Sequence, residues 1–407
     1  MVDNAKIYTK TSESVSVGHA DKLADQVADS IFDLLRTYKK DAQSAVEVAA
    51  AADTLLIFGE IDKDIVNATN GETRVEQANP QLAELIKETA LRTIREIGYE
   101  AKDYSPEILV KLVTQSVEIN NAVEENDEHE AAAGDQGIVT GFAVAETKQY
   151  HALHFILAHR ILQALEKDRE SGRFEWLNPD AKSQVTVSYK YSENGLDTPF
   201  AIDNIIISQC HTEDISLEDF RKTLTSRAKE ISEEFLKENA NFLNSDRLIE
   251  SLDNAEFLIN PAGSWHLGGP QSDSGLVGRK LVVDNYGSAA PIGGGATSGK
   301  NMNKVDRSGA YYARHIAKSI VSSGLAEKCL VELGFAIGVS KAISVNIETY
   351  GTETVSLQEI HEKIEERFDF TVTSMIELAN DVEKAIETSR HGNYTNDEFS
   401  WEKPVQL

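Results

Sequence analysis

Apolar residues recur along the chain with two different periods, which predict helices and strands in an interleaved order. Between residues 19 and 37, apolar side chains that include Leu23 and Ile31 recur at every third or fourth position, as on the buried face of an amphipathic helix. Another helix is predicted to begin at Pro80, because proline is favoured in the first helical turn, and to end at Gly98.

The remaining elements follow the same two periods without a clear repeat. Further helices are predicted at residues 151–166, 217–238 and 308–321, with two more near the C-terminus. Strands are predicted at residues 44–51, 54–61, 109–114, 185–191, 202–210, 281–286, 329–337 and 342–347. Residues 124–133 are acidic and small, which predicts a mobile loop. This interleaving indicates an α+β fold with helices laid on sheets.

The charge balance of the chain limits its partners. Its 407 residues include 40 Lys and Arg against 67 Asp and Glu, for a formal net charge of −27. A chain this acidic repels nucleic acid and anionic membranes, so neither is expected as a partner. An anionic substrate would need a local cluster of Lys and Arg that works against the overall field. The length indicates two or three domains.

Cysteine and histidine give no sign of a disulfide framework or a metal site. Cys210 and Cys329 are far apart in apolar surroundings and are expected to be reduced and buried. Of His151, His154 and His159, only the first two share a helix face closely, so packed or surface roles are favoured over metal binding. Without an apolar leader or a long apolar run, a cytoplasmic protein is expected.

Candidate chemistry is concentrated in three segments, and residues 14–25 (SVSVGHADKLAD) are the first. His19 and Asp21 stand at the start of a predicted helix, where free N–H groups and the positive dipole end favour an anion. His19 could donate a hydrogen bond to a phosphate oxygen, and Asp21 could hold Mg²⁺. Taken alone, an ordinary helix start with an acidic first turn is the simpler interpretation.

The second segment, residues 293–307 (GGGATSGKNMNKVDR), combines a flexible backbone with positive charge. Its backbone N–H groups could cradle phosphate, which Lys300 and Lys304 would neutralise, and Asp306 could supply a Mg²⁺ ligand. A Walker A loop is also suggested, but Asn301 follows Lys300 where that motif has Ser or Thr. The alternative is a glycine-rich surface turn.

The third segment is GGPQSDSGLVGRK, which precedes the strand predicted at 281–286. Arg279 and Lys280 suit a phosphate clamp better than a core, and Asp273 lies in a glycine-rich loop where it could point into a cleft. The alternative is a solvated loop with a charged strand start. Two weaker segments, 134–137 (GDQG) and 179–184 (PDAKSQ), taken alone indicate a tight turn and a strand start.

The order of these segments resembles that of the S-adenosylmethionine synthetase family. The matching stretches are TSESVSVGHADKLADQVAD, AAGDQG, PDAKSQVT, INPAGSWHLGGPQSDSGLVGRKLVVDNYG, GGGATSGKNMNKVDRSGAYYARHIAKSIV and FSWEK. They run from about Ile7 to Pro404, and the resemblance is thin between Ser188 and Asn254 and in the C-terminal helices. Six motifs in one order are far more specific than any single motif.

The resemblance implies three similar sheet-plus-helix domains in a pseudo-threefold arrangement, built from non-contiguous segments. The expected domains are an N-terminal one of residues 1–17 with 146–256, a central one of 18–118 with 269–308, and a C-terminal one of 119–145 with 257–268 and 309–407. The resemblance also implies ATP and L-methionine as substrates. It further implies a homodimer with active sites between subunits, commonly paired into a tetramer.

The resemblance implies a role for each matching residue. His19 would lie near the C5′ oxygen of ATP, and the phosphate-binding cations would be Lys182, Arg279, Lys280, Lys300 and Lys304. Positions around methionine and the reacting centre would be Glu60, Gln115, Asp135 and Asp273, with Asp180 at the ribose and Trp265 beside adenine. Metal ligands would be Asp21 and Asp306 for Mg²⁺, with two ions per site, and Glu47 for K⁺.

These residue types suit the implied reaction. The thioether sulfur of methionine is already nucleophilic, so its attack on C5′ of ATP needs no general base. The protein must instead align the reacting atoms and stabilise the departing tripolyphosphate, which the cations would do. Asp135 and Asp273 could offset the charge of the new sulfonium. The same cations would then hold tripolyphosphate for hydrolysis to pyrophosphate and phosphate, as in the family.

Several positions depart from the family pattern. They are Val17 and Ala20 at the helix start, the stretch at residues 49–53 (AAAAD), Trp265, and Thr297 and Asn301 in the glycine-rich loop. None of them removes a phosphate-binding cation or a proposed Mg²⁺ ligand. Two alternatives therefore stay open: a catalytically altered or inactive relative that binds nucleotide or a partner, and a P-loop kinase or NTPase.

Overall fold

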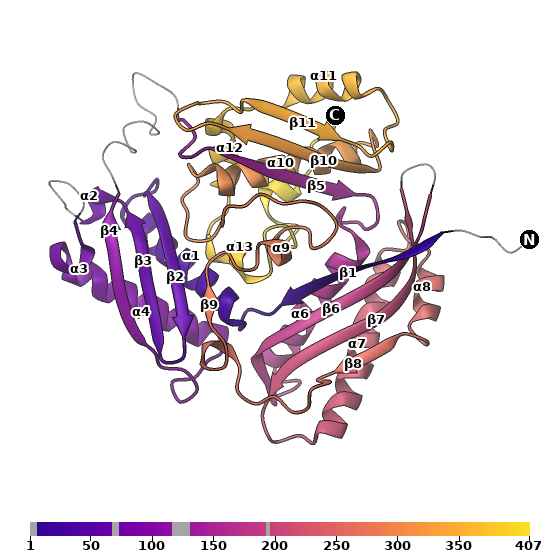
Figure 1. Ribbon diagram of the computed structural model, residues 1–407, viewed down its shortest axis with the longest axis horizontal. Coiled ribbons are helices and arrows are strands. Elements are labelled where there is room, and N and C mark those ends of the chain that lie inside the picture. The colour runs from indigo at the N-terminus through magenta and orange to yellow at the C-terminus, as the bar shows by residue number, and fades with distance from the viewer. Residues whose placement is uncertain (1–5, 67–72, 116–130, 193–195) are drawn as a thin grey trace, which may run out of the picture.

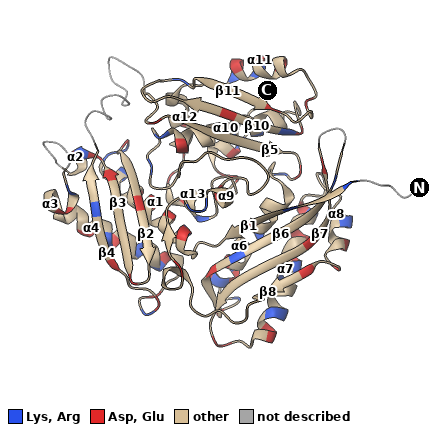
Figure 2. Cartoon of the chain, in the orientation of Figure 1, with Lys and Arg blue, Asp and Glu red and all other residues tan. Residues whose placement is uncertain are grey.

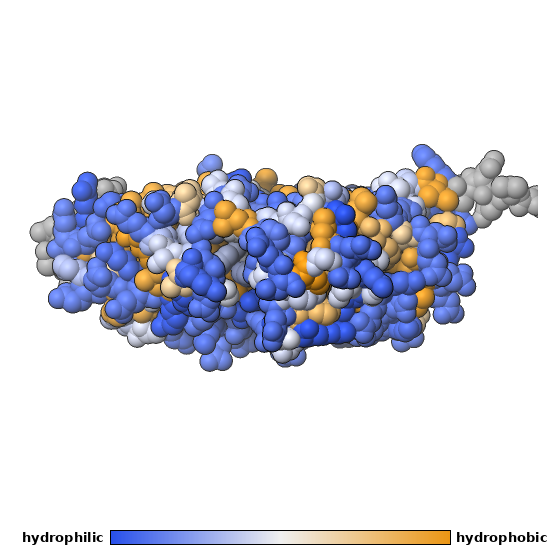
Figure 3. All heavy atoms as spheres, turned by 90° about the horizontal axis from the view of Figure 1, so that it is seen from below, coloured by the Kyte–Doolittle hydropathy of each residue, from blue (hydrophilic) through white to orange (hydrophobic). Residues whose placement is uncertain are grey.

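The computed structural model describes residues 6–66, 73–115, 131–192 and 196–407, which form three sheet-plus-helix units around a shared centre (Figure 1). The molecule is flattened, and the edge seen in Figure 3 carries mostly hydrophilic residues with scattered apolar ones. Residues of both charge signs are spread over all three units (Figure 2). No helix in the described ranges is long and apolar enough to span a bilayer.

The first unit is a four-stranded sheet in the order β4-β3-β2-β9. Its strands are β2 (Ser44–Ala51), β3 (Thr54–Ile61), β4 (Glu107–Thr114) and β9 (Gly275–Leu276). Its helices are α1 (Ala20–Tyr38), α2 (Lys63–Val66), α3 (Val75–Ala78) and α4 (Pro80–Ile97). Alternate residues of β2 are buried because one face of the sheet packs against α1, which in turn contacts α4.

The second unit is a four-stranded sheet in the order β1-β6-β7-β8. Its strands are β1 (Ile7–Val15), β6 (Leu177–Lys190), β7 (Thr198–His211) and β8 (Glu256–Ile259). Its helices are α6 (Leu153–Glu170), α7 (Leu217–Glu238) and α8 (Ser245–Ser251). The hydroxyl of Ser183 in β6 donates to the carbonyl of Ala158 in α6, which places that helix on one face of the sheet.

The third unit is a three-stranded antiparallel sheet in the order β11-β10-β5. Its strands are β5 (Gly137–Val144), β10 (Lys328–Phe335) and β11 (Ser344–Glu348). Its helices are α10 (Val305–Ser322), α11 (Leu357–Arg367) and α12 (Val372–Ala379). Helix α10 approaches β5 so closely that a Cβ on Gly141 would lie 1.9 Å from the carbonyl carbon of Ala313.

Short elements lie among the three units: η1 (Gly269–Gln271), α9 (Leu281–Asp284), α13 (Ile386–Arg390) and η2 (Ser400–Glu402). Each sheet contains strands from distant parts of the chain, which confirms the α+β fold of three sheet-plus-helix domains built from non-contiguous segments. The domain limits remain a proposal. Within it, β8 is better counted with the N-terminal domain, because it pairs with β7.

Most predicted elements are confirmed, and β2, β3 and α7 have the predicted limits. The strand predicted at 281–286 is wrong, because these residues begin with the helical turn α9, in which the N–H of Asp284 donates to the carbonyl of Lys280 at 2.8 Å. A short apolar run does not distinguish a strand from a buried helical turn. Residues 179–184 lie inside β6 rather than before it. Of the loop predicted at 124–133, residues 124–130 fall outside the described ranges.

The packed role expected for the histidines and cysteines is confirmed. On α6, His154 Nδ1 lies 2.8 Å from Ser12 Oγ, and His159 Nδ1 lies 3.0 Å from Ser14 Oγ. Burial lowers the pKa of both imidazoles to about 3, so they stay neutral in the folded protein. Both cysteines are free and buried. Within the described residues, no group of three metal-ligating side chains occurs.

A buried ionic cluster ties the C-terminal segment to α10. Glu402 accepts a hydrogen bond from Arg314 Nε at 2.9 Å and another from Lys318 Nζ at 2.7 Å. The side chains of Glu402 and Arg314 are 0% exposed. A buried charge without its partner is strongly destabilising, so the C-terminal segment and α10 depend on each other.

We predict that Glu402→Ala lowers the free energy of unfolding by about 3–5 kcal/mol, because two buried cations lose their shared carboxylate. Denaturant unfolding followed by circular dichroism measures the change. The matched control is Glu398→Ala, whose side chain is 87% exposed and pairs with Lys403 at 3.5 Å. It is expected to change the free energy by less than about 1 kcal/mol. Equal effects of the two variants would contradict this role for Glu402.

Candidate active site

His19 caps the N-terminus of α1 and is buried. Its Nδ1 accepts the backbone N–H of Asp21 at 3.1 Å. Burial lowers the pKa of His19 to about 4, and the positive charges of Lys280 and Lys182 lower it further, against the opposing effect of nearby carboxylates. The imidazole is therefore neutral near pH 7. Because Nδ1 accepts, the ring proton resides on Nε2, which is a hydrogen-bond donor next to a helix N-terminus.

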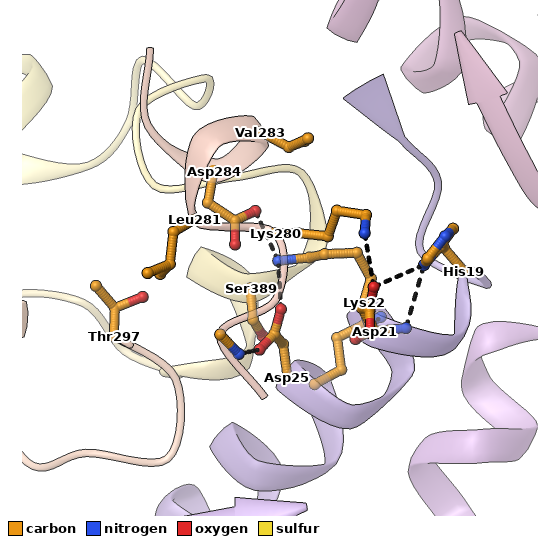
Figure 4. Close-up of polar contacts among 12 residues, drawn as sticks. His19, Asp21, Lys22, Asp25, Lys280, Leu281, Val283, Asp284, Thr297 and Ser389 are labelled. Carbon is orange, nitrogen blue, oxygen red and sulfur yellow. Dashed lines mark hydrogen bonds and ion pairs between the residues drawn. The ribbon is translucent and has the colours of Figure 1, made fainter. Parts of the chain in front are cut away.

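Asp21 joins this helix start to the third candidate segment (Figure 4). One carboxylate oxygen accepts from Lys280 Nζ at 2.6 Å, and the other accepts the N–H of Leu276 at 3.0 Å and lies 3.6 Å from Arg279 Nε. Burial raises the pKa of Asp21, but the bonds from Lys280 and Leu276 outweigh it and the net pKa is lowered. Asp21 is therefore ionised and sits beside two cations.

Strand β6 adds Asp180 and Lys182 to the same region. Asp180 is buried, and its Oδ2 accepts the N–H of Gly269 at 2.6 Å, while its Oδ1 has no hydrogen-bond partner within the described part of the chain. Burial raises the pKa of Asp180 to about 6. This carboxyl lines a pocket of about 210 Å³ whose wall includes Tyr99 and Leu267. Lys182 is exposed, and its charge acts on both His19 and Asp180.

Two further predicted residues lie close to this region. The indole N–H of the half-buried Trp265 donates to the carbonyl of Leu267 in the pocket wall. Asp273 is exposed, and its charge raises the pKa of both His19 and Asp180. The structure thus assembles a first group of predicted residues: His19, Asp21, Asp180, Lys182, Trp265, Asp273, Arg279 and Lys280.

A second group surrounds the N-terminus of α10. Lys300 Nζ lies 2.7 Å from Asp306 Oδ2, and Lys304 caps the helix. Burial lowers the pKa of Lys304, as does Lys300, while Glu60, Asp135 and Asp306 oppose the shift. These five side chains are therefore within electrostatic reach of one another, and they combine two cations with three carboxylates.

Gln115 and Glu47 lie near the second group. Gln115 is buried, and its N–H donates to the carbonyl of Ile61 next to Glu60. Its side-chain Oε1 has no hydrogen-bond partner among the residues that the structure describes. Glu47 lies half-buried on β2. Burial raises the pKa of Glu47, Lys300 lowers it and Asp25 raises it.

Within the part of the chain that the structure describes, the two groups make no direct polar contact with each other. Among the described residues, no hydrogen bond or ion pair joins a side chain of the first group to one of the second. The charges that most shift the pKa of His19 all belong to the first group, and those that most shift the pKa of Lys304 all belong to the second. Each group alone therefore has only some of the five phosphate-binding cations that the sequence suggests. We call these five cations the clamp: Lys182, Arg279, Lys280, Lys300 and Lys304.

Aspartates recur on α1 at positions 21, 25, 29 and 33, and of these only Asp21 is among the residues predicted from the sequence. Each accepts backbone N–H groups from a segment distant in sequence, and Asp29 also pairs with the fully buried Arg307 at 2.8 Å. The signal was available, because an acidic residue recurred every fourth position along a helix whose other faces are largely apolar. Their partners are distant in sequence and could not be read from it.

Comparisons with known proteins agree along the whole chain. Sequence models of the S-adenosylmethionine synthetase N-terminal, central and C-terminal domains match residues 7–126, 130–265 and 267–403. S-adenosylmethionine synthase of Oenococcus oeni is 40% identical over 98% of this chain and 96% of its own length. The same-named proteins of Zymomonas mobilis and Mycoplasma capricolum are 37% and 36% identical, each over 97% of this chain and over 96% and 94% of their own lengths.

With all three domains matched in order and relatives above 30% identity aligned over nearly their full length, this chain belongs to the S-adenosylmethionine synthetase family.

Proposed function

We propose that the chain makes S-adenosylmethionine from ATP and L-methionine and releases the triphosphate chain of ATP. The observation that carries the proposal is the first group, in which a neutral, buried His19 at a helix N-terminus stands among Lys182, Arg279 and Lys280. This arrangement suits an anionic leaving group at its point of departure. The adjoining pocket, which Asp180 lines, would hold the ribose of the same nucleotide. Trp265 would lie beside its adenine.

The proposed reaction is a single displacement. A lone pair of the methionine sulfur forms the S–C5′ bond as the C5′–O bond breaks, and the bonding electrons of C5′–O leave with tripolyphosphate. His19 Nε2–H donates a hydrogen bond to the departing oxygen, and the cations neutralise the charge that develops on it. Since sulfur carries no proton, no base is required. Asp135 and Asp273, both exposed, would offset the sulfonium charge.

The family is metal-dependent, and we propose Mg²⁺ and K⁺ as the ions. Asp21 and Asp306 would hold Mg²⁺, two ions per site, because both offer carboxylate oxygens beside phosphate-binding cations, and such oxygens are the ligands that Mg²⁺ prefers. Bound Mg²⁺ would neutralise charge on the polyphosphate. Glu47 would hold K⁺, since a half-buried carboxylate with a raised pKa gains from a monovalent cation.

We propose that each active site is completed by a second copy of the chain. The first group would come from one subunit, and Glu60, Gln115, Asp135, Lys300, Lys304 and Asp306 from its partner. The absence of a direct polar contact between the two groups among the described residues supports this arrangement, since either group alone has only some of the required cations. Such a homodimer would have two equivalent sites, and two dimers could pair into a tetramer. The cations would then hold tripolyphosphate for hydrolysis to pyrophosphate and phosphate.

The alternative functions gain no support. A Walker A lysine would be followed by a hydroxyl that binds Mg²⁺, but Asn301 is buried. Its Oδ1 accepts the N–H of Ser44, and its Nδ2 donates to Gln43. An inactive relative would be expected to lack several cations, and all five are present. A cytoplasmic location remains a proposal, with which the two free, buried thiols agree.

The direct test is incubation of the purified protein with ATP, L-methionine, Mg²⁺ and K⁺, followed by mass spectrometry. We expect methionine-dependent S-adenosylmethionine with equal amounts of pyrophosphate and phosphate. ADP without S-adenosylmethionine would instead establish a kinase or NTPase, and a folded, ATP-binding protein without turnover would establish an inactive relative.

We predict that Lys182→Met and Arg279→Leu each lower kcat by about 10²–10³-fold, because each removes a cation that stabilises the leaving group. Steady-state rates of S-adenosylmethionine formation measure the loss, and circular dichroism checks the fold. Lys222→Met, at an exposed position on α7, is the control and should keep the wild-type rate. A near-normal rate in either clamp variant would refute its assignment.

We predict that two inactive variants restore activity to each other when co-expressed. A dimer of one Arg279→Leu chain and one Lys304→Met chain would have one site with both changes and one with neither, so random pairing restores about a quarter of the wild-type rate. Co-expression of two differently tagged Arg279→Leu chains is the control. No recovery in the mixed sample would show that each site lies within one chain.

A further inference from the structure

The loop that carries Arg279 and Lys280 is fastened to α1 at several points. The N–H groups of Leu276 and Gly278 donate to Asp21 and Asp25, each at 3.0 Å. The loop also lies directly against the first turn of the helix, because a Cβ on Gly275 would be only 2.0 Å from the carbonyl oxygen of Ala20. Two backbone N–H groups of this loop, two residues apart, are thus hydrogen-bonded to carboxylates on consecutive turns of α1.

The far end of the same loop is held by a buried lysine. Lys22 Nζ lies 2.7 Å from Asp284 Oδ1 and 3.1 Å from Asp25 Oδ2, so its ammonium group bridges α1 and α9 (Figure 4). The side chains of Lys22 and Asp25 are 1% exposed, and that of Asp284 is 6% exposed. The N–H of Asp284 donates to the carbonyl of Lys280 at 2.8 Å, which connects the buried cluster directly to a clamp residue.

This cluster has no direct part in the proposed chemistry. The ammonium group of Lys22 is enclosed and occupied by two carboxylates, so it is not presented to a ligand as Lys280 and Arg279 are. Burying one ammonium and two carboxylates is costly, and apolar residues of similar volume would often serve stability equally well. Its value is geometric, since charged hydrogen bonds fix direction and distance more narrowly than apolar contacts.

We propose that Lys22, Asp25 and Asp284 are positioning residues that hold the loop bearing Arg279 and Lys280 in register with His19 and Asp21. Only the expected effect on catalysis rests on the proposed function. Its immediate consequence is polyphosphate affinity, because two cations fixed in place lose less conformational freedom on binding than two mobile ones.

The test uses Asp284→Asn, which keeps the size and a hydrogen-bond acceptor but removes the charge that holds Lys22. Calorimetry with Mg²⁺ and a non-hydrolysable imido analogue, used for tripolyphosphate throughout because the proposed function hydrolyses the natural compound, should show about tenfold weaker binding than wild type, from the loss of one charge-assisted bond. The kcat for S-adenosylmethionine should fall by about the same factor, with the KM for methionine unchanged. A merely structural role would lower the amount of active protein and leave the Kd for tripolyphosphate unchanged.

The matched control is Asp33→Asn on the same face of α1. Asp33 also accepts two backbone N–H groups, from Ala385 at 2.8 Å and Ile386 at 3.1 Å, but that segment carries no residue of the proposed clamp. Its Kd for tripolyphosphate should equal that of the wild type. If Asp284→Asn does not fold, Asp25→Asn is measured against the same criteria.

Two outcomes overturn the positioning role: a wild-type Kd in the folded variant, or equal weakening in the variant and the control. The wild-type protein tested beside them separates this result from the proposed function. Formation of S-adenosylmethionine by the wild type reports on the function, whereas the ratio of the tripolyphosphate dissociation constants reports on positioning whether or not turnover occurs.

Discussion

The aspartates along one face of α1 are the constraint on which the rest of the structure depends. They stand one per turn, and each accepts main-chain N–H groups from a distant segment: Leu276 for Asp21, Gly278 for Asp25, Gly299 for Asp29, and Ala385 and Ile386 for Asp33. Because the bonds are to backbone, they fix where each loop runs. The loop that contains Leu276 and Gly278 carries Arg279 and Lys280, and the loop that contains Gly299 carries Lys300 and Lys304, so a single helix holds the loops of both groups.

Buried charges such as these contribute less to the free energy of folding than apolar residues of similar volume often would. Asp29 and Arg307 are both 0% exposed, and the desolvation of such a pair can exceed its mutual attraction. Each member is nevertheless bonded, so none is left as an isolated charge. The same logic extends to the C-terminal segment, where Glu402 is shared by Arg314 and Lys318. Defined geometry between distant segments is what these clusters provide.

The sequence predicted most of the regular elements, and the reasons are local. The limits of β2, β3 and α7 follow from apolar periodicity, and Gly98 ends α4 because it adopts φ 116°, a left-handed conformation that glycine tolerates. The departures from the family pattern also fit: Val17 and Ala20 are buried in the first unit, and Asn301 bonds to Ser44.

What the sequence could not predict depends on distant pairing. The three apolar residues that begin α9 match a strand as well as a helical turn, and apolar periodicity alone does not decide between them. The bond between Lys22 and Asp284 joins positions 262 residues apart. The sequence motifs likewise identify each clamp cation separately. They do not predict that Lys280 and Lys304 belong to different groups in the folded chain.

The decisive measurement is a structure of the protein bound to Mg²⁺, an ATP analogue with a non-hydrolysable triphosphate, and an L-methionine analogue in which a methylene group replaces the sulfur, so that no attack on C5′ occurs. The account predicts that one triphosphate chain contacts Arg279 and Lys280 of one subunit and Lys300 and Lys304 of its partner, with His19 facing the C5′ oxygen. A triphosphate held by all four cations of a single chain, or bound away from both groups, would contradict it.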